Sequence, residues 1–342
     1  MTRLNPPRDC TYLDADWRIL ARHWFPIARS ADVGDKPFAA RLLDIDLVVW
    51  RTGEGYRAAR DICPHRGVPL SRGWVKDEHL ICPYHGLHFG QDGRCTRIPA
   101  QPDFVPPDKF RVEQFPLIER YGLLWTSLDP PESEPDIPDF PYWDEPGYQA
   151  ILPPFVDIAA APGRQVEGFV DVAHFAWVHD QAFADREMPE VPAFHTEPTE
   201  KGLRAEYWSD VSNYPKALQH LEPPGFKWLR VFEVHPPFAA SLTVHFPGQD
   251  RLHILNLASP VSARRTRLFV PIARNFDVTG SLEGVYAFNA QIFAEDAALV
   301  ECQQPPDLPL DNSEVIHFAA DRTGMGYRRL LKGMGLTLVG RN

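Results

Sequence analysis

Two short segments of the chain each combine a thiol with an imidazole. The first reads DICPHRGVPL and holds Cys63 and His65, and the second reads ICPYHGLHFG and holds Cys82 and His85. Thiolates suit iron–sulfur clusters, zinc or copper(I), whereas imidazole accepts most first-row metals. Proline and glycine flank both pairs, which is typical of loops. The two mixed pairs therefore predict one metal centre held between two loops.

The order of the ligand types separates two candidates for this centre. Zinc modules usually keep like ligands together, two cysteines and then two histidines, whereas here each loop supplies one of each. A [2Fe–2S] cluster with two thiolates on one iron and two imidazoles on the other needs mixed loops of this kind, and the neutral imidazoles raise its potential. We favour the cluster, with structural zinc as the alternative.

This double motif resembles that of the Rieske family, whose loops read as CPHRG and CPYHG do here. The resemblance extends to Tyr84, which in such proteins sits beside a cluster sulfur, and to the tight Gly67 and Gly86. One departure is Leu87, where many relatives carry Trp, although leucine can still pack there. The resemblance implies that the two pairs bind a Rieske [2Fe–2S] cluster.

A third segment, VEGFVDVAHFAWVHD, has helical character and places Asp171, His174 and His179 in a D-x-x-H-x-x-x-x-H pattern. On one helix, Glu167, Asp171 and His174 fall within roughly a 60° arc. His179 lies about 140° from His174, so a regular helix would not aim both imidazoles at one ion. We expect the helix to be distorted there or to end near Val178. Spacing alone leaves open ordinary packing of both histidines.

Following a Rieske domain, this pattern resembles the mononuclear iron motif of the ring-hydroxylating Rieske oxygenases. The resemblance implies that His174, His179 and one carboxylate bind one face of Fe(II), which leaves the other face for O₂ beside the substrate. In the family the acid that matches Asp171 is an electron bridge between an iron-ligand histidine and a cluster histidine of the neighbouring subunit. The alternative is an acid that only orients its histidine.

One position near this motif departs from the family. Many relatives carry Asn three or four residues before the bridging acid, where this chain has Gly168 and Glu167. The role of that Asn in the relatives therefore cannot be assigned to a residue of this chain. Glu167 is either an acid near the iron or a charge on a helix face.

We expect the carboxylate ligand in LEGVYAFNAQIFAEDAALVECQQP, which predicts a helix over 282–302. Asp296 falls on the apolar face of this helix, where a lone acid is costly unless it is paired or bound to metal. The family also places its ligand near the end of the last long helix, so we choose Asp296, with Glu295, Asp307 and Asp311 as weaker options. The apolar face comprises Val285, Asn289, Ile292, Phe293, Leu299 and Val300.

The second half of the chain is rich in aromatic side chains, consistent with an apolar or aromatic substrate, although the same residues would serve any core. We expect Asn289 to be a polar contact of the substrate pocket, with Phe288 and Phe293 beside it.

The elements around these motifs predict an α+β chain. Short strands and turn signals over 38–128 predict an antiparallel β Rieske domain, and the acidic, proline-rich 129–154 predicts a linker. The remainder, 155–342, predicts a catalytic domain with a central antiparallel sheet and helices that carry the iron ligands. The N-terminal 1–37 is expected to pack with the catalytic domain. Catalytic strands are expected at 203–211, 228–234, 240–246, 252–257 and 267–272.

Composition excludes several functions. The net charge is −11 and no block of Lys/Arg occurs, which argues against nucleic acid and anionic membranes as partners. No signal peptide or spanning apolar run is found, so we expect a cytoplasmic protein. The chain has no G-x-G-x-x-G after a strand, and a separate donor must therefore supply electrons.

By resemblance, the chain is the terminal oxygenase of a Rieske non-heme iron system. It would use O₂ and electrons from NAD(P)H, delivered by a separate reductase or ferredoxin, to hydroxylate or demethylate an aromatic or other apolar compound, as in aromatic compound catabolism. Its length is similar to that of the monooxygenase and O-demethylase branch, whose members are often head-to-tail homotrimers. The alternatives are a cis-dihydroxylating dioxygenase and a Rieske electron-transfer protein.

Overall fold

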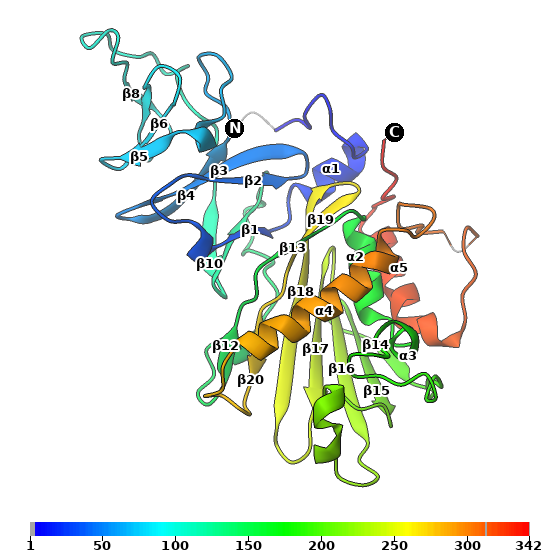
Figure 1. The fold of residues 1–342 in the computed structure, drawn as a ribbon. Coiled ribbons are helices and arrows are strands. Elements are labelled where there is room, and N and C mark those ends of the chain that lie inside the picture. Colours follow the sequence, from blue (N-terminus) through cyan, green and yellow to red (C-terminus); the bar gives the residue numbers. More distant parts are fainter. Residues whose placement is uncertain (1–3, 312, 342) are drawn as a thin grey trace. The chain divides into compact units, whose positions relative to one another are not determined.

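The computed structural model describes residues 4–311 and 313–341, which divide into two compact units (Figure 1). The first consists mainly of Leu20–Ile137, and the second of Thr11–Ile19 and 138–341. The N-terminal segment, expected to pack with the catalytic domain, is shared between them. Its helix α1 (Asp14–Leu20) lies almost entirely in the second unit, but β1 (Phe25–Arg29) is in the first because it pairs with β11 (Leu123–Thr126).

The first unit is built from three small antiparallel sheets, as the turn-rich sequence predicts. One has the order β1-β11-β10, the second β2-β3-β4-β9 and the third β5-β6-β7-β8. The third sheet packs on the second through a core that includes Trp50, Leu80 and Phe89. The further strands are β2 (Phe38–Leu42), β3 (Ile45–Thr52), β4 (Gly55–Arg60), β5 (Trp74–Lys76), β6 (His79–Ile81), β7 (His88–Phe89), β8 (Cys95–Arg97), β9 (Gln114–Phe115) and β10 (Leu117–Arg120).

The second unit contains the expected central antiparallel sheet, with nine strands in the order β12-β20-β18-β17-β16-β15-β14 and β13-β19 joined to β18. Its strands alternate buried and exposed positions, as a sheet with one packed face requires. They are β12 (Gln149–Ile151), β13 (Val156–Ile158), β14 (His195–Pro198), β15 (Leu203–Ser209), β16 (Trp228–His235), β17 (Ala239–His245), β18 (Arg251–Ser262), β19 (Arg265–Phe269) and β20 (Ile272–Arg274).

Three helices pack on this sheet: α2 (Pro162–Val170), α4 (Glu283–Val300) and α5 (Arg322–Gly333). α4 crosses the strands obliquely (Figure 1) and buries Phe293 and Val300 against β-strand residues such as Ile272. Leu299, which the helical wheel placed on the inward face, is 49% exposed. The inward face is therefore rotated slightly from the predicted one, toward Tyr286 and Ala297.

Helix α5 has no counterpart among the predicted elements, because its glycines interrupt any apolar pattern. Two of them permit close packing: a Cβ on Gly326 would lie 2.5 Å from Leu203 Cδ2, and one on Gly324 would lie 3.3 Å from the Glu167 side chain. Within the described residues, no helix is long and apolar enough to cross a membrane.

Candidate metal centres

The two Cys/His segments form loops with the same backbone hydrogen bonds. In each loop the cysteine N–H donates to the carbonyl five residues later, and the glycine N–H four residues after the cysteine donates back to the cysteine carbonyl. Both glycines have a positive φ, +70° and +66°, which explains why a residue without a Cβ stands there. The bonds join Cys63 with Val68 and Gly67, and Cys82 with Leu87 and Gly86, at 2.9 to 3.0 Å.

The four predicted cluster ligands fall into a thiol pair and an imidazole pair. Cys63 and Cys82 are buried and their side chains lie within hydrogen-bonding distance, whereas the rings of His65 and His85 are exposed with centroids 4.7 Å apart. Burial raises the pKa of the Cys63 thiol to about 11, so metal must displace its proton. The exposed Tyr84 contacts the ring of His85, with centroids 4.0 Å apart.

This two-sided arrangement suits a two-iron cluster better than a single zinc ion. Among the residues that the structure describes, the only three potential ligand atoms within 4.8 Å of one another belong to His174, His179 and Asp296. The loop ligands thus do not converge on one point, as four tetrahedral zinc ligands would. Thiols on one side and imidazoles on the other match the ligand set of a Rieske cluster.

The helix that was expected to carry the second centre is broken. α2 ends at Val170, and Asp171 is extended, with φ −81° and ψ 127°. A single helical turn, α3 (Phe175–Val178), follows, with His174 directly before it and His179 directly after it. The expected distortion is found as a break at Asp171, and only the separate second turn ends at Val178. The shared arc of Glu167, Asp171 and His174 is not formed, because the chain leaves the helix at Asp171.

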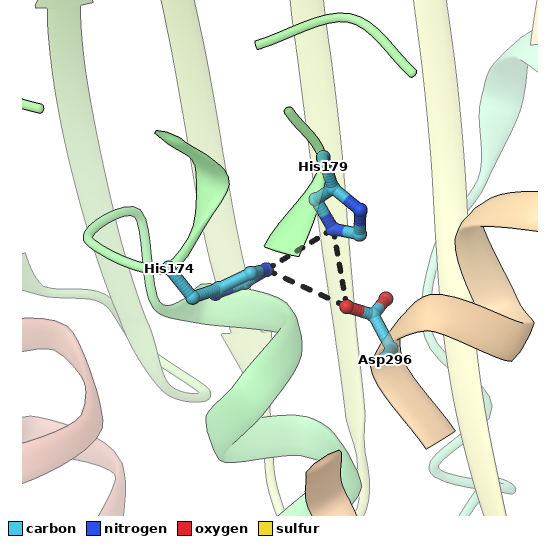
Figure 2. Close-up of side chains that lie close together, drawn as sticks. All are labelled: His174, His179 and Asp296. Atoms are coloured by element: carbon cyan, nitrogen blue, oxygen red, sulfur yellow. Dashed lines mark hydrogen bonds and ion pairs between the residues drawn. The ribbon is translucent and has the colours of Figure 1, made fainter. Parts of the chain in front are cut away.

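The break brings the two imidazoles together with the carboxylate of Asp296 on α4 (Figure 2). The two Nε2 atoms are 3.2 Å apart, and Asp296 Oδ1 lies 3.5 Å from Nε2 of His174 and 3.1 Å from Nε2 of His179. These separations would allow one first-row ion to lie about 2.1 Å from each of the three ligand atoms. The three residues therefore suit one face of such an ion.

Carboxylates also lie beside the other nitrogen of each ring. Glu295 Oε2 is 2.8 Å from Nδ1 of His179, and Asp171 Oδ2 is 3.4 Å from Nδ1 of His174. A carboxylate that accepts the Nδ1 proton leaves Nε2 free for a metal. Burial alone would lower the pKa of His179, but Asp296 and Glu295 outweigh it and raise the pKa.

The weaker ligand candidates lie outside the triad. Glu295 binds Nδ1 of His179 and accepts a bond from Gln291 Nε2 at 2.8 Å. Asp307 forms an ion pair with Arg264 at 2.8 Å. Asp311, which is exposed, accepts the N–H of Ser313.

Glu167, left open as an acid near the iron, is bound elsewhere. Its Oε2 accepts a bond from Nη2 of Arg328 at 2.9 Å, and Oε1 binds Nε of the same guanidinium. Arg328 is only 4% exposed. Glu167 is therefore the counter-ion of a buried arginine on α5, which no local sequence pattern indicates.

The proposed pocket residues lie on α4, half-buried. The side-chain amide of Asn289 donates to the carbonyl of Val285 at 2.8 Å, within its own helix. Phe293 packs against the sheet core, and Phe288 is partly exposed. Their contact with substrate stays a prediction.

The chain matches known proteins over almost its whole length. Residues 23–116 match the Rieske [2Fe-2S] domain, and 158–337 match the vanillate O-demethylase oxygenase C-terminal domain. Methylxanthine N1-demethylase NdmA of Pseudomonas putida is 32% identical over 93% of this chain and 90% of its own. The vanillate O-demethylase oxygenase subunit of Pseudomonas sp. (strain HR199 / DSM 7063) is 26% identical over 90% and 92%. The solved structure of Pseudomonas putida CBB5 NdmA with caffeine superposes with a TM-score of 0.80, at 29% identity over 93% and 92%.

Proposed function

This chain belongs to the Rieske non-heme iron oxygenases, and from that premise we propose that it hydroxylates or oxidatively demethylates an organic substrate at an iron in its second unit. His174, His179 and Asp296 would hold the mononuclear iron, which would supply O₂ activation with electrons from the Rieske cluster. The chain is the terminal oxygenase, and a reductase or ferredoxin provides the electrons. The match of 158–337 to an oxygenase domain disfavours a pure electron-transfer protein.

The metal ligands of this proposal are His174, His179 and Asp296. The observation that carries it is the separation of their three ligand atoms, between 3.1 and 3.5 Å, on one side of a common point. Three ligands on one face leave other positions free for O₂. Glu295 would hold His179 in the tautomer that presents Nε2 to the metal.

Asp171 is proposed as the electron bridge. It accepts the N–H of Ala173 at 2.8 Å, which fixes its carboxylate beside His174, yet the side chain is 35% exposed. It also lines an open groove of about 790 Å³ with the exposed Trp177 and Phe318 on its wall. An acid that touches an iron ligand and also reaches the surface can meet a second protein chain.

We propose that the chain forms a head-to-tail homotrimer, because the cluster histidines and the Asp171 groove are both accessible to another copy. The cluster histidines His65 and His85 are exposed in the first unit, and the groove at Asp171 is open in the second. If His65 and His85 of one copy docked in the Asp171 groove of the next copy, the cluster of the first would lie beside the iron site of the second. Light scattering after gel filtration tests this, and a monomer at working concentration would contradict it.

The substrate class is drawn from the relatives. They include N- and O-demethylases and monooxygenases, so an N-methyl, methoxy or ring carbon of an aromatic or other apolar compound is the proposed target. Asn289, Phe288 and Phe293 stay the proposed pocket residues. cis-Dihydroxylation is the alternative outcome.

Oxygen incorporation tests the proposed function. The protein, supplied with a reductase, ferredoxin and NADH, is given methoxylated, carboxylated and N-methylated aromatic compounds under ¹⁸O₂. We expect O₂ uptake coupled to formaldehyde release or to a product with one labelled oxygen. Two labelled oxygens in one product would indicate dihydroxylation instead. Cluster reduction without coupled product from any compound would count against an oxygenase.

A further inference from the structure

The sheet β5-β6-β7-β8 has one packed face and one open face. Its packed face enters the core of the first unit through Val75, Leu80, Phe89 and Cys95. Cross-strand partners share a face of a sheet, and the register pairs Trp74 with Ile81, Ile81 with His88, His88 with Arg97, and Lys76 with His79. This face therefore carries Trp74, Lys76, His79, His88 and Arg97, which we call the basic face. Ile81 lies on the same face but is buried, whereas Trp74, Lys76 and Arg97 are exposed and the two histidines are partly exposed.

The two permanent charges of the basic face lack counter-ions. Lys76 and Arg97 are exposed, and neither forms an ion pair within the described part of the chain. Other arginines of the same unit do find carboxylates, as Arg60 does with Glu113 at 2.7 Å. Unpaired cations on one sheet face are notable in a chain whose net charge is −11.

The histidines of the basic face lie among these cations. The rings of His79 and His88 have centroids 5.9 Å apart. Burial lowers the pKa of His88, and the positive charges of Arg97, His79 and Lys76 lower it further. The turn between β5 and β6 carries two acids, Asp77 and Glu78, and Glu78 accepts the N–H of Gly53. No carboxylate lies on the basic face itself.

The basic face adjoins the cluster loops. β6 ends at Ile81, the residue before Cys82, and β7 begins at His88, the residue after Leu87. The carbonyl of Leu87 accepts the N–H of Cys82 at 2.9 Å. At about 3.3 Å per strand residue, His79 lies within roughly 10 Å of Cys82 along the chain. His88 directly follows Leu87, whose carbonyl is bonded to Cys82. A protein that covers the basic face would bring its redox group close to the cluster.

We propose that the basic face is the docking surface of an acidic electron-donor protein, an inference that rests on the proposed function. Each encounter oxidises the donor by one electron and gives that electron to the cluster. Electron-transfer encounters are small and transient, and opposite charges raise their association rate more than their affinity. Trp74, which is 46% exposed, supplies an aromatic anchor among the charges.

Because the basic face is positively charged, an acidic protein is its expected partner, and reversing the charges of the face tests this. The doubly reversed variant Lys76→Glu/Arg97→Glu is compared, as the full chain with its cluster, with Lys36→Glu/Arg51→Glu. The control makes the same change in net charge at two exposed positions of the same unit. Stopped flow measures cluster reduction by a pre-reduced acidic [2Fe–2S] ferredoxin, and separately by a neutral photochemical reductant.

We expect Lys76→Glu/Arg97→Glu to lower the second-order rate constant with the ferredoxin at least tenfold at low ionic strength. The control variant should change it less than threefold, and the neutral reductant should reduce all three proteins alike. The wild-type rate constant should fall as salt is added, since salt screens attraction. Equal effects of the two double variants, or a rate constant that rises with salt, would overturn the proposal. Loss of the oligomer in the Lys76→Glu/Arg97→Glu variant alone would assign the face to a second copy instead.

This test is independent of the oxygenase chemistry, because it reads cluster reduction alone. A protein that forms no oxygenated product but shows the charge-dependent reduction would contradict the proposed function and keep the docking surface. A protein that oxygenates substrate but whose cluster reduction does not depend on Lys76 and Arg97 would support the proposed function and contradict the docking surface.

Discussion

Glu295 Oε2 lies 2.8 Å from Nδ1 of His179, while Asp296, the next residue of α4, places Oδ1 3.1 Å from Nε2 of the same ring. Two neighbouring acids thus approach one imidazole from opposite sides. Of the two, only Asp296 also lies beside His174, with Oδ1 3.5 Å from its Nε2. The structure assigns different contacts to the two residues of the ED pair, and they should respond differently to substitution.

Asp296→Asn should abolish binding of the mononuclear iron, because the anionic ligand is lost. Glu295→Gln should retain the ion with affinity weakened about 10–100-fold, as is usual for a residue that orients a ligand histidine. Iron per chain, measured with the cluster absorbance as an internal reference, separates the two variants. Iron loss from Glu295→Gln but not from Asp296→Asn would reverse the assignment.

Asp171→Asn should leave both iron centres bound, because Asp171 is 3.4 Å from Nδ1 of His174 and is not one of the triad. Electron transfer from cluster to iron should slow by orders of magnitude. Single-turnover reoxidation of the reduced cluster, with substrate and O₂ present, measures this rate. Normal reoxidation coupled to product would contradict the bridge.

Glu167→Gln should destabilise the fold without removing iron. The substitution leaves the buried Arg328 without its counter-ion, and loss of one partner of a buried pair costs about 3 kcal/mol. Glu206→Gln is the matched control, since its partner Arg204 is 31% exposed and such pairs contribute about 0.5 kcal/mol. Urea unfolding and iron content are measured together. A stable Glu167→Gln protein that lacks iron would place Glu167 at the metal.

Asp307→Asn should lower the free energy of unfolding by about 1 kcal/mol at pH 7. Burial alone would raise the pKa of Asp307, but Arg264 and the N–H of Gly340 outweigh it and lower the pKa. A lowered carboxyl pKa stabilises the fold fully above the ordinary value of 3.8 and loses this contribution as the pH falls through the lowered pKa. The difference between variant and wild type should therefore stay constant from pH 7 to about pH 4 and shrink below it. Urea unfolding across this range checks it, and a difference that grows with acidification would be inconsistent.

The sequence predicts best what is local in the chain. The cluster loops each lie within six residues, and their glycines adopt the positive φ that such turns need. The mismatch of His174 and His179 on a regular helix correctly predicts that no single regular helix carries both, since α2 ends at Val170 and a separate turn ends at Val178. Five of the nine strands of the second unit, β15 to β19, are predicted from the sequence. The short strands β12, β13, β14 and β20 are not, and β12 lies within 129–154, which was expected to be a linker.

Contacts between distant segments do not follow from local patterns, and the choice of Asp296 as partner of His174 and His179 rests in part on the family resemblance. Glu167 and Arg328 are 161 residues apart, and neither position indicates the other. Helix α5 is stabilised by packing that its glycines permit, whereas glycine alone predicts a break. The amide of Asn289 bonds within its own helix, which a helical wheel does not show.

The proposed oxygenase needs two kinds of iron centre in one chain. Iron and acid-labile sulfide, measured per chain in the purified protein, test this directly. We expect three irons to two sulfides, with a brown colour and, after reduction, an EPR signal shifted by imidazole ligation. Two irons to two sulfides in a protein supplied with ferrous iron would leave no iron for His174, His179 and Asp296, and would contradict the oxygenase.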